Sequence, residues 1–380
     1  MDSDLTYEKK QKTSETEDKK EKNEALSQKK LMWRKFKRNR VAVLGLLVII
    51  FIYFLVGFAN FFSPYPQNKR HEYYTNKPPH IVHFWDENGL GRPFIYEYEQ
   101  EYDMETFQTT YVQNEEKKHY IYFFNRGEEY NLLGFFNTDI KFFGLEDDEY
   151  RIFLLGTDRF GRDMVSRILN GGRISLSISL LGVLIMVVLG SLLGTVSGYY
   201  GGIIDDLLQR VIEFLLSFPR IPLWMALSAA LPSDWSSVRI YIGIVIILGA
   251  VGWPRLGRQV RAIVMGMSDD EFVQAAKSSG ASDFYIIVRH LIPNSLSHII
   301  VVATLQVPGM ILGEASLSFL GLGIQPPMTS WGVLLQEVQN VRSLALTPWL
   351  FLPTIFIIIS ILSFNFLGDG LRDAADPFSN

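Results

Sequence analysis

Cysteine is absent from the 380-residue chain. Disulfide bonds, cysteine-ligated metals and thiol nucleophiles are therefore excluded. A phosphate-binding loop is missing as well, because the nearest candidate, Ala276-Lys277-Ser278, lacks the glycines of the G-x-x-x-x-G-K-[ST] pattern. No convincing Ser/His/Asp or paired-carboxylate arrangement is present, and two surface histidines, His80 and His83, are too few to hold a metal ion. The sequence predicts a protein that is not an enzyme and that binds neither metal nor cofactor.

Acidic residues are also missing from one basic stretch, residues 29–40, which carries Lys29, Lys30, Arg34, Lys35, Lys37, Arg38 and Arg40 with Trp33 and Phe36 interleaved. This composition is compatible with a nucleic-acid patch. The stretch directly precedes a long apolar run, however, and the positive-inside rule favours a membrane-surface segment that keeps the N-terminus in the cytoplasm. We therefore expect lipid rather than nucleic acid beside it.

Apolar residues make up 48% of the chain and are gathered into long segments. About 20 such residues cross a bilayer as a helix. The first segment, 41–62, is too long for a signal-peptide core, so we expect it to be retained as a span. Five further segments lie near 174–197, 203–231, 239–258, 296–320 and 347–367. Six spans with a cytoplasmic N-terminus place the C-terminus, and the loop 259–295, in the cytoplasm.

These segments divide the chain into a disordered tail (1–30), a basic segment with the first span (31–62), an extracytoplasmic insert (63–160), a core with five spans (161–367) and a cytoplasmic C-terminus (368–380). In the insert, residues 94–98, 106–112 and 119–124 alternate aromatic or β-branched residues with polar ones. That alternation predicts strands and a mostly β insert. Arg210 and Glu213, within the third span, are one helical turn apart and are expected to pair.

Residues 268–293 have the pattern of soluble structure between apolar segments. Ser268 followed by Glu271 predicts a capping box and a short helix. Gly280 suits the left-handed position that ends a helix. Ser282 and Asp283 are expected to cap a second helix. Pro293 is expected to end that helix or to begin the next element. The alternative is an ordinary loop with two helical turns.

With these motifs in place, the chain resembles the permease subunit of binding-protein-dependent ABC importers of the dipeptide/oligopeptide type, and within it the C-type permease. Gln274-Ala275-Ala276, Gly280 and Ile292-Pro293 match the family's cytoplasmic EAA loop. Three further blocks match in order: Gly156-Thr157-Asp158 to Gly172-Arg173-Ile174-Ser175-Leu176, then Glu314-Ala315-Ser316 to Ser330-Trp331-Gly332, then Gly368-Asp369-Gly370 to Asp376-Pro377. Two departures are the Gln274 that stands where the family has Glu, and an insert longer than expected.

The resemblance implies an all-α polytopic membrane protein with six helices of the type I importer kind, carrying the β insert between the first two. It implies a bacterial inner-membrane location and a heterodimer with a second permease. Two ATPase subunits, which bind ATP and Mg, and an extracytoplasmic binding protein are the implied partners. The EAA loop is the implied contact with the ATPases, through Glu271, Phe272, Gln274, Ala275, Ala276, Gly280, Ala281 and Phe284. Because Gln274 carries no charge, Glu271 is the candidate replacement for the family carboxylate.

Other charged residues are candidates for the pathway or a gate. Asp158, Arg162, Asp163 and Arg167 are expected to form an ion-pair network before the second span, either as a gate or binding-protein contact or as a structural network. Glu314 either lines the pathway or joins helices, because polar groups in lipid are costly. Arg220 is a candidate for attracting a peptide carboxylate. Peptide is the expected cargo. Nickel, glutathione or a glycoside is the alternative within the family, and a proton-coupled secondary transporter is the alternative outside it.

Overall fold

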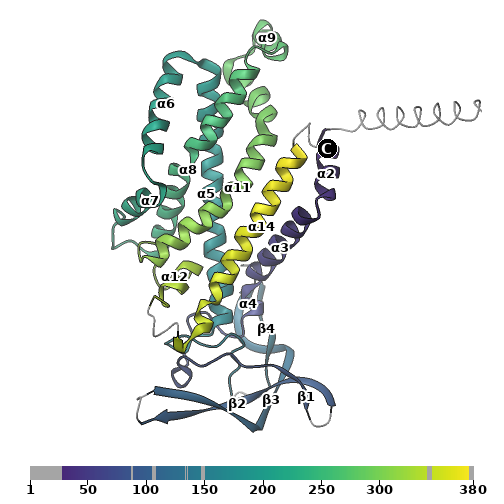
Figure 1. Ribbon diagram of the computed structural model, residues 1–380, viewed down its shortest axis with the longest axis vertical. Coiled ribbons are helices and arrows are strands. Elements are labelled where there is room, and N and C mark those ends of the chain that lie inside the picture. Colours follow the sequence, from purple (N-terminus) through teal and green to yellow (C-terminus); the bar gives the residue numbers. More distant parts are fainter. Residues whose placement is uncertain are drawn as a thin grey trace, which may run out of the picture.

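The computed structural model describes residues 28–86, 89–104, 108–132, 134, 136–146, 150–339 and 345–375. Helices form an elongated bundle, and a small sheet lies beyond one end of it (Figure 1). Helix α9 (Glu271–Ser278) lies at the opposite end (Figure 1). Most of the predicted tail 1–30, together with Thr106, Asp376 and Pro377, lies outside the described residues.

The bundle consists mainly of α3 (Arg40–Gly57), α5 (Met164–Tyr200), α8 (Ser237–Met267), α11 (Ile292–Phe319) and α14 (Leu352–Ala375). Within the described residues, five helical stretches are long and apolar enough to span a membrane. Each overlaps one predicted span, and 203–231 is the predicted span that none of them overlaps. Shorter helices flank them, namely α2 (Gln28–Arg38), α4 (Ala59–Phe62) and α12 (Trp331–Gln336), with 3₁₀ turns η1 (Glu72–Tyr74) and η3 (Pro348–Phe351).

The predicted span 203–231 is not one straight helix. It is divided into α6 (Gly202–Ser217) and α7 (Arg220–Ala229), which meet at 89°. The break follows from Pro219, which disfavours helical conformation at Phe218, and Phe218 is extended with ψ 139°. The described residues therefore hold six spans only if this bent pair counts as one.

Small residues let the long helices approach closely. A Cβ on Gly198 of α5 would lie 2.6 Å from the carbonyl oxygen of Arg261 on α8. A Cβ on Gly45 of α3 would lie 2.7 Å from the carbonyl oxygen of Ser363 on α14. Such contacts bring backbones together, and packing of this kind drives helix association in lipid, where hydrophobic exclusion is weak.

The insert contains a four-stranded antiparallel sheet in the order β1 (His83–Asp86), β2 (Gly89–Asp103), β3 (Gln108–Leu132), β4 (Phe136–Leu145). Phe94 of β2 pairs with Tyr120 of β3, and Phe123 of β3 with Phe143 of β4. The described parts of the three predicted strand segments lie in β2 and β3. The expected β structure is therefore present, with strands longer than the sequence pattern indicated.

Lys77 and His80 lie in an aromatic core within the insert, where Tyr74, Tyr150 and Phe153 surround them. The Lys77 Nζ donates to Tyr150 Oη at 2.6 Å and lies over the rings of Tyr74 and Tyr150, at 4.5 and 4.3 Å from their centroids. Burial lowers the pKa of Lys77 to about 7, although the charge of Glu97 acts in the opposite direction.

His80 is not the surface residue that the sequence suggested, since it is only 4% exposed. Its Nδ1 accepts a hydrogen bond from Phe153 N at 2.9 Å, and its Nε2 lies 3.1 Å from Tyr150 Oη. Burial lowers the pKa of His80 to about 3. Its ring is therefore a neutral core group with both nitrogens engaged.

The depressed pKa of Lys77 predicts a pH-dependent stability of the insert. In the unfolded chain Lys77 titrates near its ordinary value of about 10.4, so between pH 7 and 10 the unfolded state binds more protons than the folded one. Stability then rises with pH across that window and is flat below it. Hydrogen exchange of residues 94–98 and 150–157, corrected for intrinsic rates, measures this slope. Lys77→Met removes most of it, whereas Lys117→Met, at an exposed site on the same sheet, does not. An unchanged slope in Lys77→Met contradicts the prediction.

Candidate functional site

Residues 268–293, here called the coupling segment after the ATPase contact that the family resemblance implies, begin differently from the sequence prediction. The N-cap of α9 is Asp270, and Glu271 is the first helical residue. The predicted capping box is wrong, because α8 runs on to Met267 and Ser268 ends that helix, its hydroxyl donating to Met265 O at 2.9 Å. An acidic residue in the first turn still complements the helix dipole, and Glu271 provides it.

The rest of the coupling segment follows the local signals more closely. Gly280 has φ +79°, the left-handed conformation predicted for it. Ser282 caps α10 (Asp283–Ile286) by accepting from Tyr285 N at 3.3 Å. Pro293 neither ends the helix nor starts a separate one. A π-helical turn, η2 (Ile287–Leu291), joins α10 to α11, so that residues 283–319 form one continuous helical stretch. Pro293 follows directly on the π turn, where the regular i→i−4 hydrogen-bond pattern of the helix is already interrupted.

One face of the coupling segment packs on the bundle and anchors the segment to it. Val273, Ile286 and Leu291 are fully buried and belong to the main hydrophobic core. At the C-terminal end of α5, Tyr199 donates to Asp283 at 2.8 Å and carries Lys277 over its ring at 4.9 Å. The two short helices are therefore fixed to α5 and α11 together.

The predicted contact residues lie on the other side of the coupling segment. Phe284 is 75% exposed and Phe272 is 37% exposed. Glu271, Gln274 and Ala275 are exposed, while Ala276 and Ala281 are half-buried and pack against the core. The Gln274 side chain donates to Ser268 O at 3.3 Å, so it binds back onto its own loop.

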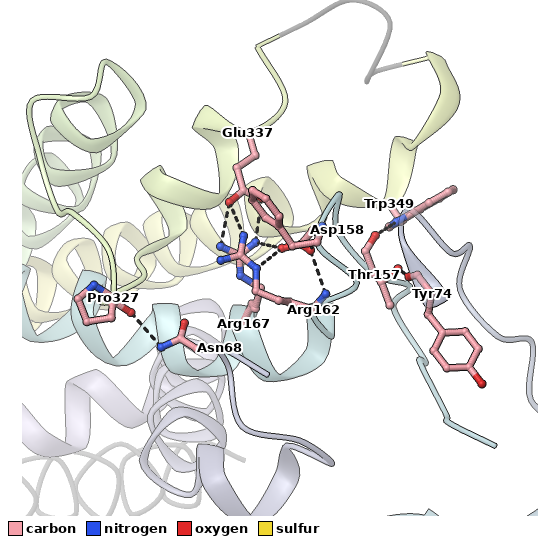
Figure 2. A network of polar contacts seen from close by, with 10 residues as sticks. Asn68, Tyr74, Thr157, Asp158, Arg162, Arg167, Pro327, Glu337 and Trp349 are labelled. Atoms are coloured by element: carbon pink, nitrogen blue, oxygen red, sulfur yellow. Dashed lines mark hydrogen bonds and ion pairs between the residues drawn. The ribbon is translucent and has the colours of Figure 1, made fainter. Parts of the chain in front are cut away.

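A second group of charged residues lies where the start of α5 meets the end of α12, and Figure 2 shows their contacts. The Asp158 carboxylate accepts from Arg162 Nε at 2.6 Å and from Arg167. Glu337, at the end of α12, accepts from Arg162 at 2.9 Å and from Arg167 at 2.9 and 3.0 Å. Two arginines thus share two carboxylates, and Arg167 is only 1% exposed. The expected ion-pair network is present, with Glu337 as a member that the sequence did not indicate.

Asp163 does not belong to this network. Its Oδ2 caps α5, accepting from Ser166 N at 2.7 Å and Ser166 Oγ at 2.6 Å. Its Oδ1 is buried and has no partner among the described residues. Burial raises the pKa of Asp163 to about 6, because desolvation outweighs the hydrogen bonds from Ser166.

Neighbouring hydrogen bonds attach the insert to the network. Asn68 donates to Pro327 O at 3.2 Å, and Trp349 donates to Thr157 O at 2.9 Å (Figure 2). Thr157 N in turn donates to Lys77 O at 2.9 Å. The insert, the start of α5 and the loops beside α12 and η3 therefore form one connected layer.

Glu314 and Arg220 lie within the bundle. Glu314 is fully buried, and its carboxylate accepts from Ser175 of α5 and from Ser318, each at 2.7 Å. The carboxylate therefore links α11, on which Glu314 lies, to α5 through Ser175. Arg220 is half-buried, with its guanidinium 3.5 Å from Gln306 Oε1 and 5.6 Å from the Trp224 ring. Among the described residues, Glu314 and Arg220 share no hydrogen bond or ion pair with each other, with the Asp158–Arg162–Arg167–Glu337 network or with the coupling segment.

Comparisons with known proteins agree with these features. The profile described as binding-protein-dependent transport system inner membrane component matches residues 186–379, and that of the N-terminal TM domain of oligopeptide transport permease C matches residues 27–79. The oligopeptide transport system permease protein OppC of Haemophilus influenzae is 43% identical, over 58% of this chain and 69% of its own length. The dipeptide transport system permease protein DppC of Alkalihalophilus pseudofirmus is 43% identical, over 58% and 71%. The glutathione transport system permease protein GsiD of Pectobacterium atrosepticum is 40% identical, over 59% and 72%.

Among solved structures, a chain of the MetNI methionine ABC transporter in an inward-facing conformation is similar with a TM-score of 0.43. Its sequence identity is 17%, and the match covers 56% of this chain and 97% of that one.

Because Asp158, Arg162, Arg167 and Glu337 form a buried ion-pair network, we expect two glutamine variants to differ in stability. Breaking a buried ion pair costs about 3 kcal/mol, because the remaining charge keeps its desolvation penalty. Glu337→Gln leaves both arginines with Asp158 alone and lowers the free energy of unfolding by about that amount. The measurement is the thermal unfolding midpoint of the purified chain, which falls as the free energy falls. Arg210→Gln is the control. It breaks the exposed pair with Glu213, 3.5 Å apart, and costs less than about 1 kcal/mol. Equal shifts in the two variants contradict a buried, stabilising network.

Proposed function

Because the chain belongs to the binding-protein-dependent transport system inner membrane component family, in its oligopeptide and dipeptide permease branch, we propose that it forms half of a translocation pathway for di- or oligopeptides. Separate ATPase subunits drive transport through the coupling segment, and ATP and Mg²⁺ bind to those subunits. A second permease completes the pathway, and an extracytoplasmic binding protein delivers the cargo.

One structural observation carries this proposal. The coupling segment projects beyond the bundle at the end opposite the sheet, and it is fixed to two spans at once (Figure 1). A force applied to α9 or α10 passes through Asp283 and Tyr199 into α5, and through the unbroken helix into α11. This is the mechanical requirement of a lever that converts the motion of another subunit into the motion of spans.

Phe284 is the proposed anchor in the ATPase. It is the most exposed large apolar side chain of the coupling segment, and an exposed aromatic ring on a rigid support is typical of a binding hot spot. Glu271 and Phe272 stand on the adjoining helix. Gln274 contributes less, because its amide is directed to Ser268 O within the same loop.

The remaining assignments follow the geometry. The outer network of Asp158, Arg162, Arg167 and Glu337 joins α5 to α12, so we assign it to the extracytoplasmic gate or its frame. Asp163 supports it by capping α5. Arg220 lies at the break between α6 and α7, where we place the wall of the pathway. Glu314 is assigned to helix packing.

The cargo is proposed from the relatives. Two of them are peptide permeases by name and a third is a glutathione permease, so glutathione is the competing cargo closest to a peptide. Nickel and glycosides are further candidate cargoes within the family. N- and C-termini in the cytoplasm of a bacterial inner membrane complete the proposal.

The transport proposal predicts loss of coupling when the exposed ring is removed. Phe284→Ser lowers the amount of ATPase that co-purifies with the chain at least about tenfold, because a hot-spot residue contributes about 2 kcal/mol or more. ATP-dependent uptake of a labelled tripeptide into proteoliposomes that hold the complete complex falls with it. Phe84→Ser, at a 55% exposed ring on the sheet, leaves both unchanged. Uptake driven by a proton gradient without ATPases refutes the proposed function.

The charge of the coupling contact is tested separately. Glu271→Lys weakens ATPase binding and lowers peptide-coupled hydrolysis, because it reverses the exposed carboxylate one turn before Gln274 on α9. Gln274→Glu restores part of the loss by supplying a carboxylate one turn away. If Glu271→Lys leaves both binding and coupled hydrolysis intact, Glu271 does not replace the family carboxylate.

A further inference from the structure

Aromatic rings form a continuous series from the sheet-side end of α3 onto the sheet. Phe54 of α3 contacts Phe62 of α4 with ring centroids 5.8 Å apart, and Phe62 contacts Phe142 of β4 at 5.2 Å. Phe142 then contacts two consecutive residues of β3, Phe123 and Phe124. The series thus leads from a membrane span, through α4, to the sheet.

The backbone at Phe124 is arranged so that both β3 rings face the same side. Consecutive side chains of a regular strand point to opposite faces. The rings of Phe123 and Phe124 nevertheless both reach Phe142, at 5.6 and 6.1 Å. Phe124 has φ +57°, a left-handed conformation that bulky residues rarely adopt. The two rings remain 55% and 65% exposed, so this unusual conformation presents them at the surface.

The same surface continues along α3. Leu44, Leu47, Phe51 and Phe54 are about half exposed or more and recur at helical spacing, which makes one apolar stripe. On a helix that spans a bilayer, such a stripe faces lipid. The ring series begins at Phe54, the last residue of the stripe. The exposed rings of β3 therefore extend a lipid-facing surface.

A basic pocket of about 290 Å³ lies between the β3–β4 ladder and the chain that follows α4. Its lining includes four basic side chains and one acidic one: Lys69, Arg126, Lys141, Arg151 and Glu128. Lys141 is 4% exposed, and its Nζ donates to Asn60 O of α4 at 2.9 Å. The excess of positive charge is local, since acidic residues outnumber basic ones in the insert as a whole.

We propose that the β3–β4 ladder binds phospholipid of the leaflet on the sheet side. Phe123 and Phe124 enter the boundary between headgroups and acyl chains, and the basic pocket takes the phosphate of a lipid headgroup. Aromatic side chains concentrate at this depth of a bilayer, and Lys and Arg cover apolar surface while keeping their charges at its polar edge. Phe142 contacts Phe62 of α4, and Lys141 of the pocket donates to Asn60 O of the same helix, so the ring series and the pocket meet at α4. Lipid binding of this kind holds the sheet against the bilayer whether or not the cargo is a peptide.

Spin-label depth measurements test the aromatic contact. The chain has no native cysteine, so Phe123→Cys carries a single label in the full chain reconstituted in phospholipid bilayers. Collisions with molecular oxygen exceed those with a water-soluble nickel chelate several-fold at this site. The control is Phe84→Cys on β1, which is equally exposed at 55% and shows the reverse order. A nickel-accessible label at 123 overturns the proposal. A label shielded from both reagents overturns it too, because it shows a protein partner instead of lipid.

Lipid exchange on the purified full chain tests the pocket, with phosphatidylglycerol as the probe. Arg126→Gln and Lys141→Gln each lower its retention several-fold. The Arg126 side chain is 87% exposed, so that variant separates binding from folding. Arg92→Gln, outside the pocket lining, leaves retention unchanged. Inorganic phosphate in excess does not displace the lipid. Displacement by phosphate, or unchanged retention in both pocket variants, overturns the headgroup site.

Discussion

The structure depends on one constraint, namely that a charge removed from water must find its partners within the chain. Arg167 shows it most clearly, because a guanidinium that is 1% exposed binds Asp158 on one side and Glu337 on the other. Arg167 and Glu337 are 170 residues apart in sequence. Satisfying one buried cation therefore determines that the start of α5 lies against the end of α12, and the insert is attached to that junction through Thr157 and Trp349.

The same constraint explains the other polar groups of the bundle. The Glu314 carboxylate takes hydroxyl donors from two helices, and the Asp205 carboxylate takes both the guanidinium of Arg261 and the hydroxyl of Ser197. Each carboxylate thus joins neighbouring helices. Polar groups are costly in lipid, so these contacts select one arrangement of helices that are otherwise apolar. At the opposite end, Tyr199 and Asp283 perform the equivalent task for the coupling segment.

How much was predictable depended on whether a feature was local. Span length and apolar composition located five of the spans, and Gly280 and Ser282 adopted the conformations that their residue types favour. The capping box predicted at Ser268 was wrong, because α8 continues past its apolar pattern to Met267 and Ser268 is the C-cap of that helix. Pro219 is visible in the sequence, but the apolar run around it predicts one continuous span over 203–231. Glu337 carried no local signal, since its role exists only when Arg162 and Arg167 are brought to it.

The insert shows how these two kinds of information combine. Alternating residues predicted its strands, but not the left-handed Phe124, because φ > 0 at a bulky residue has no sequence signature. Regular strands would have placed Phe123 and Phe124 on opposite faces, with one ring beside Phe142 and the other in water. The observed conformation exposes both rings on the side that continues the apolar stripe of α3, whereas the fully buried Lys77 lies in the aromatic core within the insert. A sheet held by its core to the rest of the insert and, on our proposal, by its rings to the bilayer has two supports, and its orientation is set by both.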